Sequence, residues 1–292
     1  MTYQTGILSP VPAHARYLSF QRKHATDPAA SLKRLATLAD GDALVVGFGA
    51  SLVKGLGVEV AGLKSFPSYP DAAITTPTTP VDLWCWLRGD DRGEIANRGR
   101  ALEQALAGAF ERVDCRDGFK HGSGRDLSGY EDGTENPEGD EALSAAIVGG
   151  SGAGLDGSSF VATQLWEHDL NHFKGLPQGE QDDIIGRRLD DNEELGDAPE
   201  SAHVKRTEQE SFSPHAIVSR RSMPWADARG EGLYFVAFGR DFSAFEAQWR
   251  RMIGLEDEIT DALFRFSRPT SGAYFWCPPT NDGSLDLTAL GL

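Results

Sequence analysis

The sequence predicts an α+β fold of two ferredoxin-like halves with antiparallel sheets, the arrangement found in dimeric α+β barrels. Short apolar stretches with strand-like alternation recur in both halves of the 292-residue chain, and helices with an apolar stripe lie between them. The first half has the element order β-α-β-β-α-β of a ferredoxin-like unit. A segment rich in glycine, serine and aspartate separates the halves. We therefore predict three parts: residues 1–121, a connector over residues 122–157, and residues 158–292.

In the first half, four strands are expected to alternate with two helices. The strands are expected at residues 16–20, 43–48, 81–87 and 111–119. One helix is expected to begin at Asp27-Pro28, where an aspartate caps the helix and a proline takes its first position, and to end at Gly41. A second helix is expected over residues 92–110, where apolar residues recur at helical spacing.

The second half repeats this pattern with more insertion. Strands are expected at residues 158–165, 216–223, 233–238 and 273–277, and helices at residues 177–188, 242–253 and 259–266. His168 and His172 stand four residues apart near the start of this half. A zinc hydrolase would need a glutamate where Asp169 stands, so we expect a solvent-facing start of a helix there.

The composition restricts the classes of function. The chain has 28 basic and 44 acidic residues and a formal net charge of −16, which disfavours binding to nucleic acid or to an anionic membrane. No apolar run reaches the length of a membrane span, and the N-terminus lacks the basic start and apolar core of a secretory signal. The cysteines, Cys85, Cys115 and Cys277, are far apart and odd in number, which fits a reducing compartment and neither a disulfide framework nor a zinc site. We expect a cytoplasmic protein.

One loop is the first candidate for a functional site. Residues 129–137 hold Asp132 between two glycines and an Asn-Pro pair, which favour tight turns. Such an aspartate either caps the turn or points into a cavity. His203 and Arg220 follow in the second half, where each alone is typical of a surface histidine or a salt-bridge residue on a strand. The three segments together indicate a function that none of them indicates alone.

Together these segments resemble the dye-decolourising peroxidases, and most closely the bacterial B-type branch that includes YfeX-like proteins. The resemblance spans nearly the whole chain and is strongest from about residue 125 to residue 278, whereas in the first half it rests on residues 6–8 and the element order. Besides the segments around Asp132, His203 and Arg220, it is carried by residues 126–129, 166–168, 185–187, 232–235 and 261–266. It implies a haem peroxidase that binds one haem b per chain, mainly in the C-terminal half, and reduces hydrogen peroxide through an oxoferryl intermediate.

On the proximal side of the haem, the resemblance implies that His203 is the axial ligand of the iron. Asp261 resembles the carboxylate that accepts a hydrogen bond from the ligand's other ring nitrogen and makes the imidazole more electron-donating. The alternative for Asp261 is an acid that stabilises the N-terminus of a helix. His215 is the competing candidate for the axial ligand, but it follows Pro214 in a polar turn and matches no motif of the family.

On the distal side, Asp132 and Arg220 match the pair that acts on peroxide. A carboxylate relays the proton between the peroxide oxygens, and a guanidinium favours the ionised carboxylate and stabilises the leaving oxygen. We expect Arg220 to be required for rapid cleavage and Asp132 to assist the proton transfer. Ser222 stands where B-type relatives carry Asn or Ser and is a candidate to hold a distal water. Arg220, and as a weaker candidate Arg187, would contact the haem propionates.

The resemblance implies that the reductants are dyes, phenolic compounds or metal ions. The acidic surface is expected to favour cationic or neutral reductants over anionic dyes. Two other functions are open: a haem-binding protein that carries haem or releases its iron, with incidental peroxide chemistry, and an α+β protein without a cofactor. The carrier has no use for Asp132 and Arg220 as a pair, whereas the peroxidase requires them.

The C-terminal residues 281–292 faintly resemble the Gly-Ser-Leu peptides that load some B-type relatives into encapsulin compartments. They follow the last strand without a flexible linker, so we expect a packed terminal segment instead. The resemblance also implies a homo-oligomer, from a dimer to a hexamer, but no interface can be read from the sequence.

Overall fold

The structure is a computed structural model that describes residues 2–292. Its main sheet has ten strands in the order β4-β1-β3-β2-β10-β5-β8-β6, with β7 paired to β8 and β9 paired to β5. Neighbouring strands of this sheet run antiparallel. The α+β fold with antiparallel sheets is therefore confirmed, and the limits of the three parts stay predictions.

The first half supplies one end of the sheet and its covering helices. Its strands are β1 (His14–Arg22), β2 (Leu44–Gly49), β3 (Leu83–Gly89) and β4 (Phe110–Phe119), and its helices are α1 (Ala29–Leu38), α2 (Ala50–Gly55) and α3 (Arg92–Leu106). The expected second helix ends early, because Phe110 pairs with Arg22 of β1 and begins a strand. The order β4-β1-β3-β2 is that of a ferredoxin-like sheet.

The second half has the same strand order with more irregular connections. Its strands are β5 (Ser159–His168), β6 (Ser219–Arg220), β7 (Met223–Asp227), β8 (Gly230–Gly239), β9 (Ser267–Pro269), β10 (Ala273–Cys277), β11 (Thr280–Asn281) and β12 (Ser284–Leu285). Its helices are α4 (Gly139–Ala146), α5 (Leu170–Gly175), α6 (Gln178–Ile185), α7 (His203–Thr207) and α8 (Ser243–Met252). Short 3-10 turns cover Thr5–Ile7, Gln209–Ser211, Ala262–Arg265 and Thr288–Leu290.

Two expected elements of this half differ from the structure. The strand predicted at residues 216–223 is interrupted between β6 and β7, because the hydroxyl of Ser222 replaces a backbone acceptor for the N–H of Val236. The helix predicted at residues 259–266 is only a 3-10 turn, since the chain continues directly into β9 and pairs with the end of β5. Pairing with a distant strand has overridden the local helical pattern.

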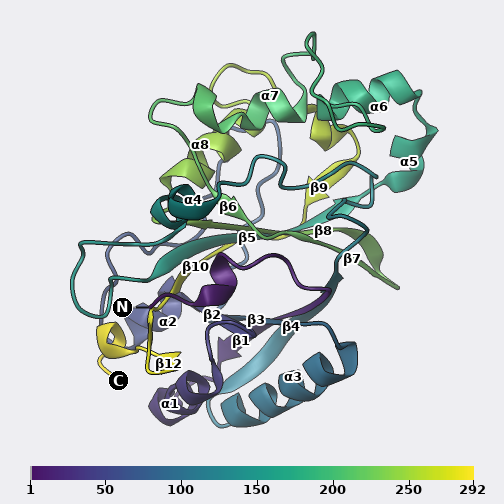
Figure 1. The fold of residues 1–292 in the computed structure, drawn as a ribbon. Coiled ribbons are helices and arrows are strands. Elements are labelled where there is room, and N and C mark those ends of the chain that lie inside the picture. Colours follow the sequence, from purple (N-terminus) through teal and green to yellow (C-terminus); the bar gives the residue numbers. More distant parts are fainter. Residues whose placement is uncertain (1) are drawn as a thin grey trace.

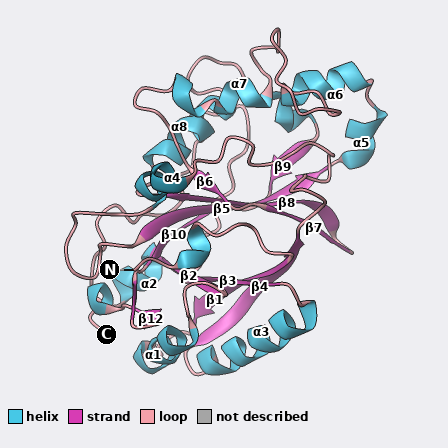
Figure 2. Ribbon diagram, in the orientation of Figure 1, coloured by secondary structure: helices cyan, strands magenta, loops and turns pink. Residues whose placement is uncertain are grey.

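The two halves of the sheet lie over each other, with helices on their outer faces (Figures 1 and 2). Strand β3 shows why both faces are apolar. Its residues Leu83, Cys85 and Leu87 face the cluster under the helices, whereas Trp84 and Trp86 face the opposite half. Burial of each large aromatic side chain contributes on the order of 3 kcal/mol. The sandwich between the halves therefore accounts for the tryptophans that alternate with aliphatic residues in this strand.

Aromatic contacts hold the two halves in register. The rings of Tyr17 on β1 and Tyr234 on β8 stack with centroids 3.8 Å apart. The indole of Trp84 donates a hydrogen bond to the Tyr234 hydroxyl at 3.1 Å. The halves are also joined by backbone pairing of β2 with β10, where Phe48 opposes Trp276.

The C-terminal segment packs against the first half. Leu285, Leu287 and Leu290 are buried in the main core, and β12 lies beside α1. The expected packed terminal segment is confirmed, and the leucines that a cargo-loading peptide would present are inside the protein. Among residues 2–292, the helices are too short or too polar to cross a membrane.

Candidate functional site

The candidate site lies between the outer face of the second half of the sheet and the layer of α6, α7 and α8 (Figure 1). His203 is the first residue of α7. Its Nδ1 lies 2.8 Å from Oδ2 of Asp261, whose side chain is fully buried. The other oxygen of Asp261 accepts the backbone N–H of Leu263 at 2.8 Å and caps the 3-10 turn. Asp261 thus has both roles considered from the sequence: it is the hydrogen-bond partner of His203 and the cap of a helical turn. Nε2 of His203 is left for a ligand.

Helix packing fixes the turn that carries His203. Gly186 ends α6 in a left-handed conformation, with φ of 94°. A Cβ atom there would lie 3.1 Å from Val204 and 3.2 Å from Ala202, and the left-handed backbone would strain any other residue, so glycine favours the close approach of α6 to α7. On the other side, the buried Arg206 forms an ion pair of 2.6 Å with Asp257. These contacts hold α7 between its neighbours.

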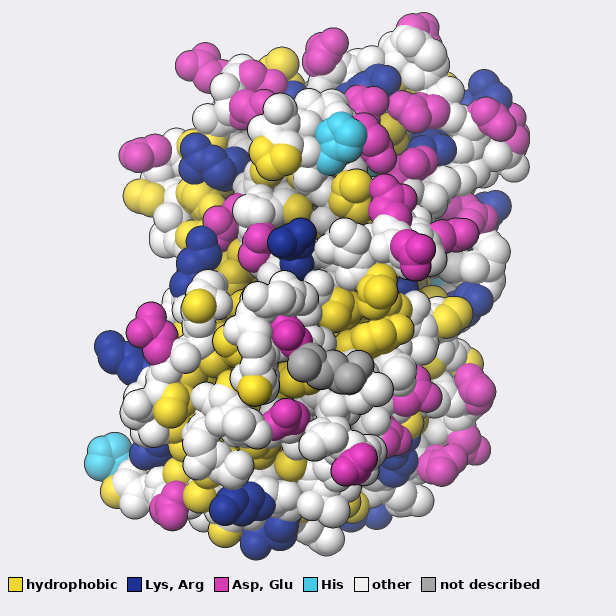
Figure 3. Space-filling model, turned by 60° about the vertical axis from the view of Figure 1, so that its left-hand side comes forward, with side chains coloured by type: hydrophobic (Ala, Val, Ile, Leu, Met, Phe, Trp, Pro, Cys, Tyr) yellow, Lys and Arg dark blue, Asp and Glu magenta, His cyan; other side chains and the backbone are white. Residues whose placement is uncertain are grey.

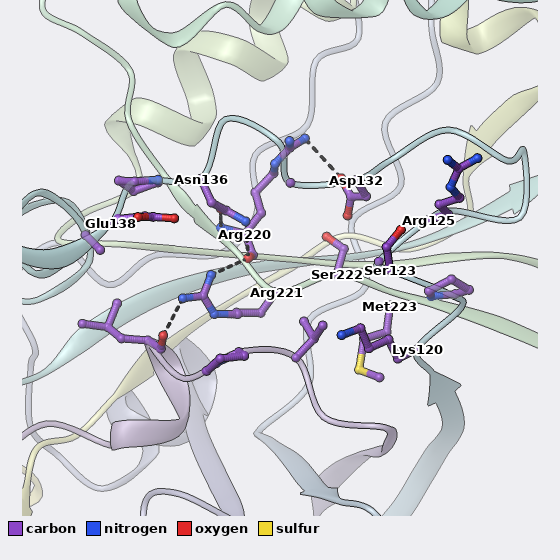
Figure 4. Close-up of a pocket in the computed structure, with 18 of the residues that line it drawn as sticks. Lys120, Ser123, Arg125, Asp132, Asn136, Glu138, Arg220, Arg221, Ser222 and Met223 are labelled. Atoms are coloured by element: carbon purple, nitrogen blue, oxygen red, sulfur yellow. Dashed lines mark hydrogen bonds and ion pairs between the residues drawn. The ribbon is translucent and has the colours of Figure 1, made fainter. Parts of the chain in front are cut away.

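Asp132 and Arg220 face one another on the opposite side of the site. Nη1 of Arg220 lies 3.5 Å from Oδ1 of Asp132, and each side chain is 21% exposed (Figure 4). The pair is brought together by Asn136, which accepts the N–H of Arg220 at 2.7 Å and donates to its carbonyl at 3.1 Å. Asn136 thus clips the loop to β6. The Asn-Pro pair signalled a turn in the sequence, but the clip to Arg220 was missed.

A second set of contacts anchors the beginning of the same loop. The carboxylate of Asp126 accepts the N–H of Ser128 at 2.8 Å and lies 3.2 Å from Nε2 of His168. Nδ1 of His168 in turn lies 2.6 Å from the hydroxyl of Ser267. Burial would raise the pKa of Asp126, but the hydrogen bond and charge of His168, with the Ser128 contacts, outweigh it and hold the pKa at about 2.

The expected solvent-facing start of a helix is present, because α5 begins at Leu170 with Asp169 as its cap and His172 exposed, but the expectation is wrong for His168. His168 is the last residue of β5 and is buried, whereas α5 begins two residues later, after Asp169 caps it by accepting the N–H of His172. A strand and a helix do not place residues four apart on one face. The sequence marked residues 166–168 only as a motif of the resemblance, and the contact between His168 and Asp126 becomes visible only in the fold.

Two adjoining cavities occupy the space between His203 and the Asp132–Arg220 pair. Their volumes are about 110 and 170 Å³, and both are lined by these three residues. The first has largely apolar walls formed by Ile185, Trp166, Leu233, Phe235, Phe245, Trp249, Met252, Leu263 and Phe266. His215 is exposed and lines neither cavity.

Arg187 and Ser222 lie further from this centre. Arg187 lines the second cavity, where it forms ion pairs of 2.7 Å with Glu135 and 3.7 Å with Glu194. Ser222 lines a third, larger cavity that also reaches Asp132 and Arg220 (Figure 4). Arg187 is therefore already neutralised by carboxylates, and Ser222 faces the side of the pair away from His203.

The residues of the two inner cavities fit a haem group. An imidazole nitrogen is free on one wall, the remaining walls are mostly apolar, and cationic guanidinium groups stand at the edge. Nε2 of Gln164 and Nε1 of Trp249, both in residues of the wall, have no partner within the described chain. A metal ligand in an apolar slot with cations at its rim is the donor set that an iron porphyrin requires.

This chain belongs to the dye-decolourising peroxidase family. The model of the family described as "Dyp-type peroxidase, C-terminal" matches residues 123–282. The chain is 33% identical over 248 residues to a dye-decolorizing peroxidase of Rhodococcus erythropolis, with 82% of this chain and 73% of the relative covered. It is 31% identical over 228 residues to one of Mycolicibacterium paratuberculosis, with 76% of this chain and 64% of that relative covered.

The structure is similar to solved members of the family. DypB from Rhodococcus jostii RHA1 matches with a TM-score of 0.87 and 27% identity, over 96% of this chain and 97% of that chain. A variant of the same protein in complex with heme matches with a TM-score of 0.86 and 26% identity, over 94% of this chain and 95% of that chain. The similarity to DypB agrees with the B-type branch that the motifs indicate. The expected family and fold are confirmed by these matches.

Proposed function

We propose that this chain is a haem peroxidase that uses hydrogen peroxide to oxidise organic reductants, such as dyes and phenolic compounds, or metal ions. The observation that carries the proposal is the pairing of two constellations around the same cavities. His203 with its buried partner Asp261 stands on one side, and the pair of Asp132 and Arg220 on the other. A haem carrier needs only the first constellation.

The proximal residues would hold one haem b per chain. Nε2 of His203 would bind the iron, while Asp261 accepts a hydrogen bond from the N–H of Nδ1, fixes the tautomer and makes the imidazole a stronger electron donor. Arg220 is the candidate for a haem propionate, and Arg187 would first have to leave Glu135. When bound, the haem supplies the iron centre at which the O–O bond of peroxide is broken and oxidising equivalents are held.

The distal residues would handle the proton and the charge. The carboxylate of Asp132 accepts the proton from one peroxide oxygen and delivers it to the other. The guanidinium of Arg220 donates hydrogen bonds to the departing oxygen, whose negative charge it stabilises. Arg220 is the dominant group in this proposal, since it acts on the charge that develops as the bond breaks.

The axial ligand is tested with two histidine variants. His203→Ala should abolish the Soret band of the protein loaded with haem, because the iron loses its protein ligand. His215→Ala is the matched control, since His215 is exposed and lies outside the cavities, and it should bind haem like the parent. Loss of haem in the control, with retention in His203→Ala, would show that the ligand is assigned to the wrong residue.

The distal roles are tested by rapid mixing with peroxide. Arg220→Leu should slow the peroxide-dependent change of the haem spectrum by about 100-fold or more, and Asp132→Asn should slow it less. Arg188→Leu, which removes an exposed cation that pairs with Asp191 and lines neither inner cavity, serves as the control for loss of a cation. If Arg220→Leu keeps haem and reacts at the parental rate, the peroxidase assignment of this pair fails, and a haem carrier becomes the better description.

The remaining properties stay predictions of this proposal. We expect a homo-oligomer between a dimer and a hexamer and a cytoplasmic location. The charge of −16 is expected to favour cationic or neutral reductants at the general surface.

A further inference from the structure

The third cavity, which we call the basic cavity, is the largest described hollow near the site. Its volume is about 540 Å³, within the range of cavities that bind small organic molecules. It lies between the turn after residue 8, the end of β4, the loop that follows Asp132, and the start of β7 (Figure 4). Asp132 and Arg220 line it as well as the inner cavities, but His203 does not. A molecule in the basic cavity would thus touch the distal pair from its other side.

The charge of this cavity is opposite to that of the protein. Its walls contain four cationic side chains, Lys120, Arg125, Arg220 and Arg221. Only two carboxylates line it, those of Asp132 and Glu138. The whole chain carries a net charge of −16, and acidic side chains are spread over the face shown in Figure 3. The basic cavity is therefore a local exception on an acidic protein.

Two of these cations lack a carboxylate partner. Arg125 is held by Glu131, and Arg220 by Asp132. The guanidinium of Arg221, which is 8% exposed, instead donates to the carbonyls of Leu8, Ser9 and Arg220, and no carboxylate among residues 2–292 pairs with it. One N–H on each of its Nη atoms has no acceptor among the residues that the structure describes.

Burial of an unpaired charge is costly, and the surroundings of Arg221 show this. Burial and, second, the positive charge of Arg88 lower the pKa of Arg221 to about 10. Lys120 is exposed at the rim and forms no ion pair with any residue that the structure describes. An anion in the cavity would receive attraction from both groups and relieve the unpaired charge.

The rest of the wall is apolar. Leu8, Pro10, Val11, Met223 and Pro224 line one part of the basic cavity. In Figure 4, Lys120 lies beside Met223 at one end, Glu138 lies at the other, and Arg221 lies between them. An aromatic ring is able to pack on the apolar part while a carboxylate attached to it reaches the cations.

We propose that the basic cavity binds small aromatic carboxylates, and that hydroxylated members of this class are reducing substrates. The second part rests on the proposed peroxidase function. Two phenolic molecules each lose one electron and one proton, and one hydrogen peroxide takes up both electrons and both protons to give two waters. Long-range repulsion by the acidic surface slows the approach of such anions, and the local cations retain them once they arrive.

Binding is tested with a pair of ligands of equal shape and different charge. 4-Hydroxybenzoate and 4-hydroxybenzamide are titrated by calorimetry into the full chain, which is first incubated with haem. The carboxylate should bind about 5- to 10-fold more tightly than the amide, because only the carboxylate meets the unpaired cations. Equal affinities for the two ligands would overturn the proposal.

The location is tested with matched lysine variants. Lys120→Gln should weaken binding of the carboxylate about 3- to 5-fold and leave the amide unchanged, since Lys120 is exposed and lines only this cavity. Lys33→Gln, which removes the same charge from the exposed face of α1, should change neither. Equal effects of the two variants would show that the net charge of the protein, and not a site at Lys120, determines the binding of the carboxylate.

Measurements of turnover distinguish failure of the proposed binding site from failure of the proposed peroxidase activity. With peroxide, KM for 4-hydroxybenzoate should rise in Lys120→Gln at unchanged kcat, with no change for the amide. Selective carboxylate binding without any turnover would leave the site standing and refute the peroxidase. Turnover of both phenols with a KM that is indifferent to Lys120 would leave the peroxidase standing and refute the site.

Discussion

Replacement of Asp126 by asparagine tests how the distal loop is held. The pKa of this carboxyl is about 2, whereas its ordinary value is 3.8, because the contacts with His168 and Ser128 outweigh the effect of burial. The difference corresponds to about 2 kcal/mol of stability at pH 7. Since the pKa is lowered in the folded protein, this contribution is fully present above pH 3.8 and is lost as the pH falls toward 2.

The assay is urea unfolding of the parent and of Asp126→Asn at pH 7 and pH 3. We expect the variant to be less stable by about 2 kcal/mol at pH 7 and by roughly half of that at pH 3. Asp190→Asn, which removes an exposed acid, is the control and should change little at either pH. A deficit of the same size at both pH values would refute the reasoning, because the loss would then come from packing and not from the ionised contact.

Two further outcomes are expected from single substitutions. Asn136→Ala should lower stability by about 2 kcal/mol and slow the reaction with peroxide, because two hydrogen bonds to the backbone of Arg220 are lost. The control Asn97→Ala, at an exposed position of α3, should do neither. Parental peroxide kinetics in Asn136→Ala would show that these two hydrogen bonds do not position Arg220. Leu290→Ala should cost about 3 kcal/mol in chemical unfolding and the exposed Leu38→Ala less than about 0.5, so similar effects would mean that the C-terminal segment is not packed.

The regular elements were predictable because their signal is local. The alternation of aliphatic residues with Trp84 and Trp86 marks a strand with two buried faces, and the structure buries both of them. The prediction failed where a distant partner decided the local conformation. The helix expected at residues 259–266 is reduced to a 3-10 turn because the residues that follow it form β9 on the edge of β5. His168 is buried because Asp126 and Ser267 satisfy both of its ring nitrogens.

The candidate site shows the same division. Residues His203, Asp132 and Arg220 were selected by their motifs, and the structure brings all three to the walls of the same cavities. The sequence allowed two roles for Asp261, as the partner of His203 or as a helix-capping acid. Only the structure shows that one carboxylate oxygen contacts His203 and the other accepts the N–H of Leu263. Ser222 was expected beside the distal pair, and it lines the basic cavity together with Asp132 and Arg220. Its role in holding a distal water stays a prediction.

The sequence by itself determined the strand and helix pattern of each half and the residue types that carry the chemistry, since both are written in short stretches of chain. Only the tertiary structure decided that the two halves face each other, that Asn136 reaches Arg220 across 84 residues, and that His203 meets Asp261 across 58. Contacts over such separations depend on how whole faces pack, and no local pattern of residues encodes them. The unpaired charge of Arg221 became visible for the same reason, because a missing partner can be recognised only once every neighbour is in place.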